Sequence, residues 1–396
     1  MKKTFLFLLL FSKEVWALDY SNQGILNDVI GSDSKFFLNL EPKLTHRLIA
    51  ESQLEDNYKT TSKRDEYEYK EITGKIRFYS NLQLNKNLSI NSYVLATRLD
   101  NANDVPTGKN RYFENFGAYF QELTLNSNHE NYSLVAGKFN LGFGSAWRFD
   151  RGLWSYNIAS NYRQTEKLGF SGVYRLGDSK KTGQYNFSFS TFTNDRKNLD
   201  NSVFVNRESD QKSNGRPGDT RSLSSYNLGL NVNFDFGKQE KLSYNFSYLN
   251  LAVNKRASPV ETSKIEDQKG FAAGMNYKYP WKENIAFDLL LEYVEMKNID
   301  GNSDLSEKYL TGNLITRFYK NWNVLIGSSK RKQIALNSNG TTQNITEISF
   351  GYDFDKTNFF DRLTLQAGLK LGYNNNEIIP QTQNSLGALL RYYKYF

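Results

Sequence analysis

Apolar and polar residues alternate along nearly the whole chain. In SYNLGLNVNFDF, aliphatic and aromatic residues occupy every second position from Tyr226 to Phe236, and asparagine, glycine or aspartate stands between them. The segments QYNFSFSTFTN from Gln184 and RLTLQAGLKLGY from Arg362 repeat this pattern. A helix would scatter these apolar residues around its axis, whereas a strand places them all on one face. The chain is therefore predicted to be all-β.

Sixteen segments carry the alternation, and most are longer than the 5–6 residues usual in soluble strands. Their length is close to the 9–11 residues that a tilted strand needs to cross a bilayer. The predicted strands are 36–53, 66–83, 88–99, 113–125, 131–140, 164–176, 184–195, 224–236, 242–253, 269–279, 285–297, 308–319, 322–330, 342–354, 362–373 and 384–396.

The connections between these strands alternate in length. The short ones are 84–87, 126–130, 177–183, 237–241, 280–284, 320–321 and 355–361. The longer ones are 54–65, 100–112, 141–163, 196–223, 254–268, 298–307, 331–341 and 374–383. A soluble sandwich has no reason to alternate in this way, but a transmembrane barrel has short periplasmic turns and longer extracellular loops. We predict a closed antiparallel transmembrane β-barrel of about 16 strands, within 14–18, with both termini periplasmic.

The first residues, MKKTFLFLLLFSKEVWALDY, indicate an export signal. Two lysines precede a short apolar run, and Ala17 lies where a signal peptidase would cleave. The alternative is a short core helix. We expect a signal peptide over 1–17 and one barrel domain over 18–396, of which 18–35 is a short lead-in.

The composition agrees with a barrel in a membrane. Aromatic residues make up 15% of the chain, proline occurs only 6 times, and the mean hydropathy is −0.64. In lipid every backbone group must pair internally, so a spanning sheet must close on itself. Its outer band is apolar and its inner face is wet, which keeps the average hydropathy low. Aromatic residues are expected at the two interfaces.

Several kinds of chemistry are poorly supported. Cysteine is absent, and the histidines are His46 and His129. Neither histidine falls where a barrel hydrolase would need one beside a serine. No enzyme activity, cofactor, catalytic residue or metal site is expected. The polar segment 196–223 reads as an exposed loop, because its aspartates lack the spacing of a calcium site.

The segment Leu134–Leu176 carries the most distinctive motif. Gly137-Lys138-Phe139 ends one strand, Phe143-Gly144 and Trp147 follow, and Tyr162, Thr165-Glu166 and Gly169 lead into the next strand. This segment resembles one in many porin-like proteins of the Gram-negative outer membrane. It resembles alginate-export barrels more distantly, because Lys138 and Phe139 stand where those proteins have arginine and glutamine. The resemblance implies a porin in the outer membrane, a homotrimer, and a third loop that folds into the lumen.

Segment 141–163 is the third long connection and has the composition of a constriction loop. It contains three glycines and several aromatic residues, and its charged residues are Arg148, Asp150, Arg151 and Arg163. Glycine permits tight turns, aromatic residues give an inward-folded loop something to pack with, and charges give a constriction its field. The alternative is an extracellular cap.

Strand phase predicts which charges face the lumen. Lys75 and Arg77 alternate with Ile76 and Phe78, and charge on the lipid face costs about 2–4 kcal/mol at the midplane. The pore-lining candidates on strands are Lys75, Arg77, Lys138, Lys167, Arg175 and Arg391. With the charge of +6 expected once residues 1–17 are removed from the +8 chain, they favour mild anion preference. The alternative is a balanced lumen, with Glu51, Asp235, Asp288 and Glu292 also facing inward.

The chain ends GALLRYYKYF, which reads as the closing strand. Leu390, Tyr392 and Phe396 share one face and resemble the C-terminal signature by which outer-membrane barrels are recognised for insertion. Lys394 departs from that signature, but it can snorkel to water at the periplasmic rim.

The sequence therefore predicts a water-filled channel for small polar or anionic solutes. A substrate-selective channel for oligosaccharide or alginate, and a non-conducting structural or adhesion barrel, remain alternatives. Expected partners are the barrel-insertion machinery, membrane lipids and lipopolysaccharide, and small solutes; no nucleic acid is expected.

Overall fold

The computed structural model describes residues 43–60, 68–99, 110–149, 152–195, 202–203, 216–220, 222–254, 265–319, 321–336, 340–375 and 380–396. The expected signal peptide, the lead-in 18–35, and both Asp150 and Arg151 lie outside these residues.

Long strands dominate the described chain. The sixteen long ones are β1 (Lys43–Thr60), β2 (Tyr69–Gln83), β3 (Leu88–Arg98), β5 (Phe116–Asn128), β6 (Tyr132–Phe139), β7 (Lys167–Asp178), β8 (Gly183–Asn194), β9 (Ser225–Gly237), β10 (Glu240–Leu251), β11 (Gln268–Lys282), β12 (Ile285–Lys297), β13 (Leu305–Phe318), β14 (Trp322–Ala335), β15 (Thr342–Phe354), β16 (Arg362–Asn375) and β17 (Pro380–Tyr395). The short β4 (Arg111–Tyr112) pairs in parallel with β2. The described helices are the 3-10 turns η2 (Ala146–Arg148), η3 (Ala159–Tyr162) and η5 (Ile299–Gly301). None of the described helices is long and apolar enough to span a membrane.

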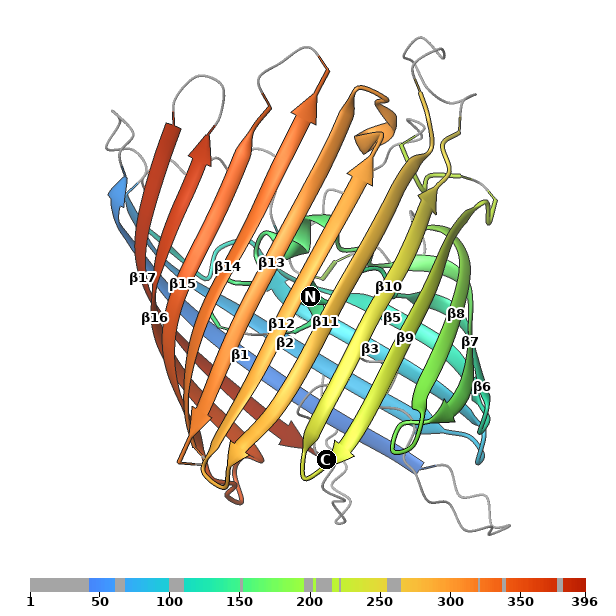
Figure 1. Ribbon diagram of the computed structural model, residues 1–396, viewed down its shortest axis with the longest axis horizontal. Coiled ribbons are helices and arrows are strands. Elements are labelled where there is room, and N and C mark those ends of the chain that lie inside the picture. The colour runs from blue at the N-terminus through green and yellow to red at the C-terminus, as the bar shows by residue number, and fades with distance from the viewer. Residues whose placement is uncertain are drawn as a thin grey trace, which may run out of the picture.

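The sheet closes on itself. Each long strand pairs antiparallel with its neighbour in the chain, and β1 pairs with both β2 and β17. Figure 1 shows the tilted strands wrapping around a common axis, with β1 and β17 side by side. Glu51 of β1 stands opposite Arg391 of β17 and Lys75 of β2. The prediction of a closed antiparallel barrel of sixteen strands is confirmed.

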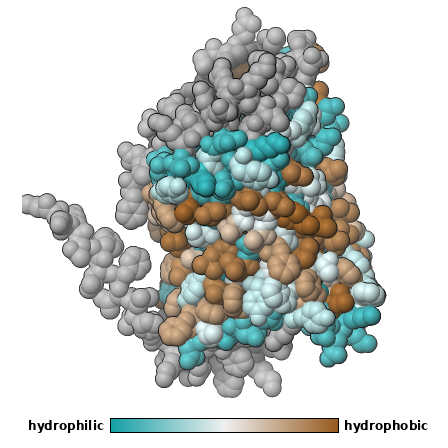
Figure 2. All heavy atoms as spheres, turned by 90° about the vertical axis from the view of Figure 1, so that its left-hand side faces the viewer, coloured by the Kyte–Doolittle hydropathy of each residue, from teal (hydrophilic) through white to brown (hydrophobic). Residues whose placement is uncertain are grey.

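The two faces of the barrel differ as the alternation requires. In β12, Leu291 is 44% exposed on the outer face, whereas Leu290 and Glu292 are 0% and 2% exposed on the inner face. Figure 2 shows the outward hydrophobic side chains gathered into a belt, with hydrophilic side chains above it and along its lower edge. This arrangement suits a sheet whose outer surface meets hydrocarbon between two polar layers.

Two strands, β1 and β14, extend furthest beyond their expected ends at the rim with the longer connections. The first was expected at 36–53, but the described strand β1 runs from Lys43 to Thr60. Likewise β14 continues to Ala335 instead of ending at residue 330. In both strands the continuation is rich in polar residues, and Glu55 and Arg331 lie on the inner face. Polar residues on the outer face, such as Asp56 in β1 and Lys330 and Lys332 in β14, interrupt the alternation that marks a strand.

The connections follow the expected alternation of lengths. Residues 84–87, 129–131, 179–182, 238–239, 283–284, 319–321 and 355–361 join strands at one rim. At the opposite rim the longest connections lie between β3 and β5, β6 and β7, β8 and β9, and β10 and β11. The connection between β6 and β7, residues 140–166, is the third at that rim and is called loop 3 below.

Candidate functional site: the inner loop and the charged wall

Loop 3 lies against the inner faces of strands on the far side of the barrel. The backbone N–H of Gly144 donates to the hydroxyl of Ser247 on β10, 3.2 Å away. The hydroxyl of Ser329 on β14 donates to the carbonyl of Ser155, 2.8 Å away. The loop therefore contacts inner-face residues that lie more than 100 positions later in the chain.

Glu292 on β12 holds both arms of loop 3. Its carboxylate accepts the backbone N–H groups of Ser145 and Ala146, the latter at 3.0 Å. It also accepts the hydroxyl of Ser145 at 2.6 Å and the hydroxyl of Tyr162 on the returning arm. Burial and the Glu292 carboxylate raise the pKa of Tyr162, so this hydroxyl stays protonated and keeps donating. Charged acceptors make the stronger hydrogen bonds in proteins.

Glu347 on β15 holds the tip of loop 3. Its carboxylate accepts the N–H groups of Leu153 at 3.0 Å and Trp154 at 2.6 Å. Gly152 precedes them with a φ of +67°, and a Cβ there would stand 1.9 Å from the Glu347 carboxylate. Glycine is therefore required at this turn, both by its backbone conformation and by the close approach to the wall.

Trp154 fixes the tip to the closing strands. Its indole N–H donates to the Glu55 carboxylate on β1 at 2.8 Å, and the Lys370 ammonium lies 5.5 Å from its ring centroid. Gly387 of β17 leaves room for the ring, because a Cβ at that position would come within 2.5 Å of it. The tip of loop 3 thus reaches the seam where the barrel closes.

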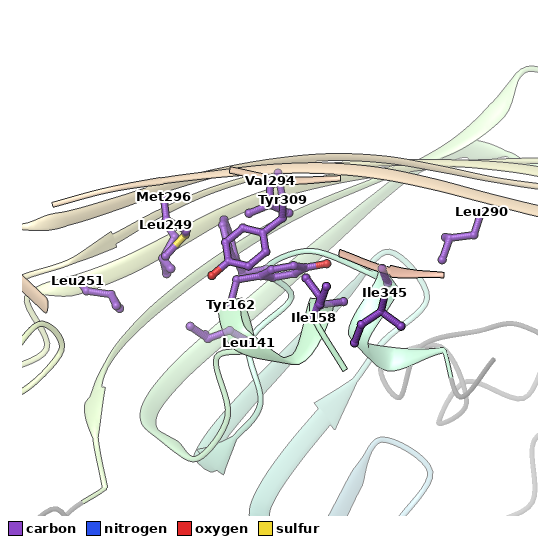
Figure 3. Packing of buried hydrophobic residues seen from close by; sticks show 14 of the residues in the cluster. Leu141, Ile158, Tyr162, Leu249, Leu251, Leu290, Val294, Met296, Tyr309 and Ile345 are labelled. Carbon is purple, nitrogen blue, oxygen red and sulfur yellow. The ribbon is translucent and has the colours of Figure 1, made fainter. Parts of the chain in front are cut away.

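An apolar core joins loop 3 to the wall. Figure 3 shows Tyr162 and Ile158 of the loop directed toward Tyr309, Val294 and Ile345. The wall side chains of this core are Val135, Phe139, Phe192, Leu249, Leu251, Ala272, Leu290, Val294, Met296, Tyr309, Ile345 and Leu389. Sequence reasoning missed them, because it expected polar inner faces throughout. The signal was present in FDLLLEYV at 287–294, where apolar residues occupy both faces of one strand.

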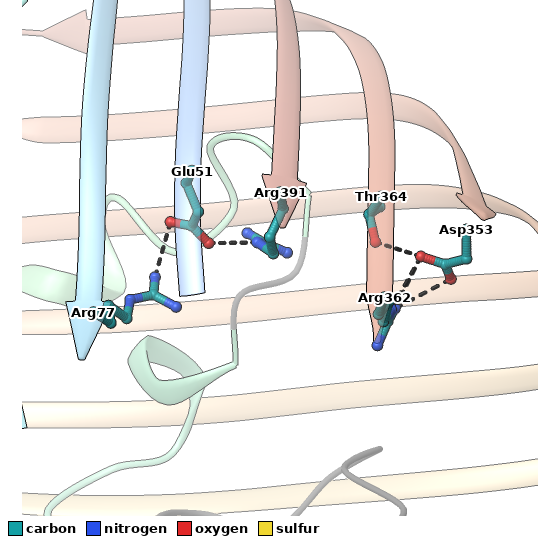
Figure 4. A network of polar contacts seen from close by, with 6 residues as sticks. All are labelled: Glu51, Arg77, Asp353, Arg362, Thr364 and Arg391. Carbon is teal, nitrogen blue, oxygen red and sulfur yellow. Dashed lines mark hydrogen bonds and ion pairs between the residues drawn. The ribbon is translucent and has the colours of Figure 1, made fainter. Parts of the chain in front are cut away.

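The wall formed by β17, β1 and β2 carries a charged cluster. The Glu51 carboxylate accepts the Arg77 guanidinium at 3.0 Å and also the guanidinium of Arg391. Figure 4 shows the three side chains in a row across adjacent strands. Lys75 lies two positions before Arg77 on β2, and its ammonium is 5.7 Å from the ring of Tyr156 in loop 3. Two cations here share one carboxylate.

A second cluster lies nearer the short-turn rim. The Arg362 guanidinium on β16 contacts both oxygens of Asp353 on β15 at 3.1 Å, and Thr364 also bonds this carboxylate (Figure 4). Arg362 lies 5.5 Å from the ring of Tyr393, and Arg47 lies 4.0 Å from the ring of Tyr79. Planar guanidinium groups favour this combination of a two-oxygen contact and ring stacking.

The remaining predicted residues lie in different surroundings. Arg148 donates to the carbonyl of Leu141 within loop 3 and stacks 5.0 Å from the ring of Trp147. Burial lowers the pKa of this guanidinium, against the opposing pull of the Glu122 and Glu292 carboxylates. Arg148 therefore faces acidic groups on both β5 and β12.

Lys138 does not line an open lumen. Its side chain is 0% exposed, and its ammonium contacts the carboxylates of Glu166 at 2.9 Å and Asp195 at 3.1 Å. These partners lie at the ends of β7 and β8, so the lysine ties three strand ends together. A solute inside the barrel could not touch this ammonium, which corrects its expected place among the pore-lining residues.

Arg163 and Lys167 line a cavity of about 620 Å³ at the long-loop end. This cavity lies between the returning arm of loop 3, residues 216–219 and the wall, where Arg331 and Glu307 form an ion pair. Arg175 lies at the opposite end and donates to the hydroxyl of Ser133 at 2.7 Å. The predicted cations are thus spread over the height of the barrel.

Comparison with known proteins supports the fold. No protein-family model matches the chain, and no curated protein matches its sequence. Among solved structures, the outer-membrane channel DcaP of Acinetobacter baumannii is similar at a TM-score of 0.53 and 10% identity, covering 91% of this chain and 99% of that one. The anion-selective porin of Comamonas acidovorans is similar at a TM-score of 0.50 and 12% identity, covering 89% and 100%. The barrel has the porin fold. At these identities the likeness concerns the fold alone.

In this porin fold, the last residue of the chain is hydrogen-bonded to the first strand. Phe396 exchanges two backbone hydrogen bonds with His46 of β1, at 2.9 and 3.1 Å. Leu390 lies on the outer face, and the Tyr392 hydroxyl donates to the carbonyl of Phe359 in the last short turn. Lys394 donates to the carbonyl of Asn358, 3.0 Å away. The lysine that departs from the terminal signature is thus accommodated at the rim. The role of Leu390, Tyr392 and Phe396 in insertion stays a prediction.

Proposed function

We propose that this protein is an outer-membrane porin, a water-filled channel through which small polar solutes diffuse passively. One observation carries the proposal: loop 3 is fixed inside a closed sixteen-stranded barrel by carboxylates on its wall, Glu292 and Glu347. A barrel of 16–18 strands is wide enough for an aqueous channel. A loop held against one wall narrows such a channel and sets its charge.

The placement in the outer membrane rests on the surface and the connections. The apolar belt suits a bilayer, and the short turns suit the periplasmic rim. Both described ends of the chain lie at that rim, because Phe396 pairs with His46. Residues 1–17 would direct export, and the long loops would face outward.

The wall formed by β17, β1 and β2 supports a mild preference for anions. Glu51 is shared by Arg77 and Arg391, and Lys75 lies beside them. The wall carboxylates Glu292 and Glu347 are engaged by backbone N–H groups of the loop. Fixed cationic charge along a pore raises the local concentration of anions. We propose Lys75, Arg77, Arg148 and Arg391 as the residues that set selectivity, with Arg163 and Lys167 at the outer entrance.

Planar-bilayer recording of the purified full chain tests this function. We expect discrete conductance steps and, under a salt gradient, a reversal potential on the anion-selective side. Cation-selective steps would contradict the anion preference but not the proposal that the protein forms a channel. The absence of steps from a correctly folded barrel would favour a structural barrel. Chemical cross-linking before electrophoresis would test the homotrimer that the resemblance to porins implies.

A further inference from the structure

Five lysines form a patch on the outer face of the barrel near the long-loop rim. They are Lys269 on β11, Lys297 on β12, Lys308 on β13, and Lys330 and Lys332 on β14. All five are exposed, and each is flanked along its strand by inner-face residues. These residues are called the outer lysine patch.

The register places lysines of like charge directly opposite each other. Lys269 pairs with Lys297 across β11 and β12, and Lys308 pairs with Lys332 across β13 and β14. Directly opposed side chains on a sheet have Cβ atoms about 4.5–5.5 Å apart, and like charges so placed are destabilising. Two such pairs on neighbouring strands therefore favour binding of a partner of opposite charge.

The described chain supplies little of that charge. Lys308 lies 3.8 Å from the Glu295 carboxylate, and the described residues provide no ion pair to the other four lysines of the patch. By contrast, the outward residues near the same rim of β15–β17 include Asn344, Tyr373 and Asn384, which are uncharged. Across β11–β17, the outward lysines near this rim therefore lie on β11–β14.

The patch borders the apolar belt directly. Phe271 on β11 and Leu310 on β13 lie two positions closer to the belt than Lys269 and Lys308, and both are exposed. Ile326 on β14 is also exposed. A ligand of matching form has several negative charges close together and long acyl chains beneath them. Phosphates would neutralise the opposed ammonium groups, and acyl chains would cover the exposed apolar side chains.

We propose that the outer lysine patch binds the phosphorylated saccharide headgroup of a lipopolysaccharide molecule in the outer leaflet. This inference rests on the proposed outer-membrane placement, because only that orientation brings the patch to the leaflet that contains this lipid. Binding at this sector orders the lipid beside β11–β14 and removes the repulsion between the paired lysines.

The test uses the full-length protein in neutral detergent and bisphosphorylated lipid A as the probe. The variant Lys297→Gln/Lys332→Gln removes one lysine from each opposed pair and leaves the Lys308–Glu295 contact in place. The control Lys180→Gln/Lys181→Gln removes two exposed lysines from a short turn at the opposite rim. Native mass spectrometry measures bound lipid A, and the temperature at which the folded gel band is lost measures stability.

We expect lipid A to bind the wild type and the control alike and to bind the patch variant about tenfold more weakly, since each basic residue near anionic lipid strengthens attraction. Without lipid A, the patch variant should be no less heat-resistant than the wild type, which separates lost binding from lost folding. Equal lipid A affinity in all three proteins would overturn the inference, as would equal binding of lipid A lacking both phosphates. Single-channel conductance of the wild type is recorded in parallel. If the protein conducts but lipid A binding does not depend on the patch, the lipid site is refuted and the porin function is not.

Discussion

At the scale of single residues, carboxylates organise the lumen. Glu292 and Glu347 accept backbone N–H groups of loop 3, whereas Glu51 joins two arginines on the wall. A buried charge is tolerated when it is paired and fully hydrogen-bonded. Glu292 and Glu347 thus hold loop 3, whereas Glu51 neutralises charge on the wall. Replacing an anchor and replacing Glu51 should therefore change the channel in different ways.

Replacing Glu51 by Gln should shift selectivity toward anions. The substitution removes a negative charge from the wall and leaves Arg77 and Arg391 without their shared counter-ion. Removing one partner of a buried pair also costs stability, on the order of 3–5 kcal/mol. Reversal potentials under a salt gradient measure the shift. Asp178→Asn, at the exposed end of β7 beside a short turn, is the control, and a shift toward cations in Glu51→Gln would contradict the assignment.

Asp361, in the last short turn, should make stability depend on pH. Partial burial raises the pKa of its carboxyl, but the Lys356 ammonium at 2.8 Å and the Tyr395 N–H at 2.8 Å outweigh burial, so its pKa is lowered below 3.8. A lowered pKa gives stability that is present above the unfolded value and lost as the pH falls through the folded value.

The measurement compares the thermal midpoints of the wild type and Asp361→Asn in detergent. The wild type should be the more stable at about pH 7, and the difference should shrink as the pH falls below 3.8. A difference that stays constant to about pH 2 would show that the carboxylate charge is not the cause.

At the scale of elements, the strands followed from the sequence more readily than the packing of loop 3. Period-two alternation located all sixteen strands, because lipid and water impose opposite chemistry on the two faces. The inward charges Lys75 and Arg77 followed from the same phase. The phase also allowed Glu292 to face inward. The anchoring of loop 3 by Glu292 and Glu347 did not follow from it, since their partners are more than 140 positions earlier in the chain.

The inner apolar core was also beyond the sequence pattern. Leu249 and Ile345 look like irregularities in otherwise polar inner faces until loop 3 is seen to cover them. The contact between Gly387 and Trp154 likewise joins two segments whose proximity only barrel closure creates. Long-range docking therefore has no local signature, apart from apolar residues on both faces of one strand.

Replacing Glu347 by Ala should loosen the tip of loop 3 without opening the barrel. The N–H groups of Leu153 and Trp154 would lose their acceptor, at a cost of about 1–3 kcal/mol for each group left unpaired. Glu292 would still hold the two arms of the loop. We expect greater current noise and higher mean conductance in single-channel records, with Asp178→Ala as the control. Traces identical to those of the wild type would show that the tip does not border the conducting path.

At the scale of the whole molecule, closure is the property that the other features require. The seam between β1 and β17 pairs along nearly its full length, from Arg47 opposite Tyr395 to Thr60 opposite Gln383. A closed barrel has no free edge strand at which unfolding can begin or another chain can pair. Loop 3 reinforces the seam, because Trp154 bonds Glu55 on one side and packs on Gly387 on the other.

The closed barrel should migrate anomalously in SDS gels unless it is heated. The unheated protein should run at a position different from the boiled chain, since detergent does not open a sheet without edges. Deleting the last strand, residues 380–396, should abolish the difference, because β1 would lose its pairing with β17 and the sheet could not close. A full-length protein whose migration ignores heating would contradict the closure.

The most direct test of the channel compares the single-channel conductance of the wild type with that of a chain lacking residues 145–156. These residues include the groups that bond Glu292 and Glu347, and their removal should leave the sixteen strands intact. If loop 3 narrows a water-filled pore, both proteins give stable steps and the shortened chain conducts more. Equal conductance in the two proteins, or no steps in either, would contradict a pore limited by this loop.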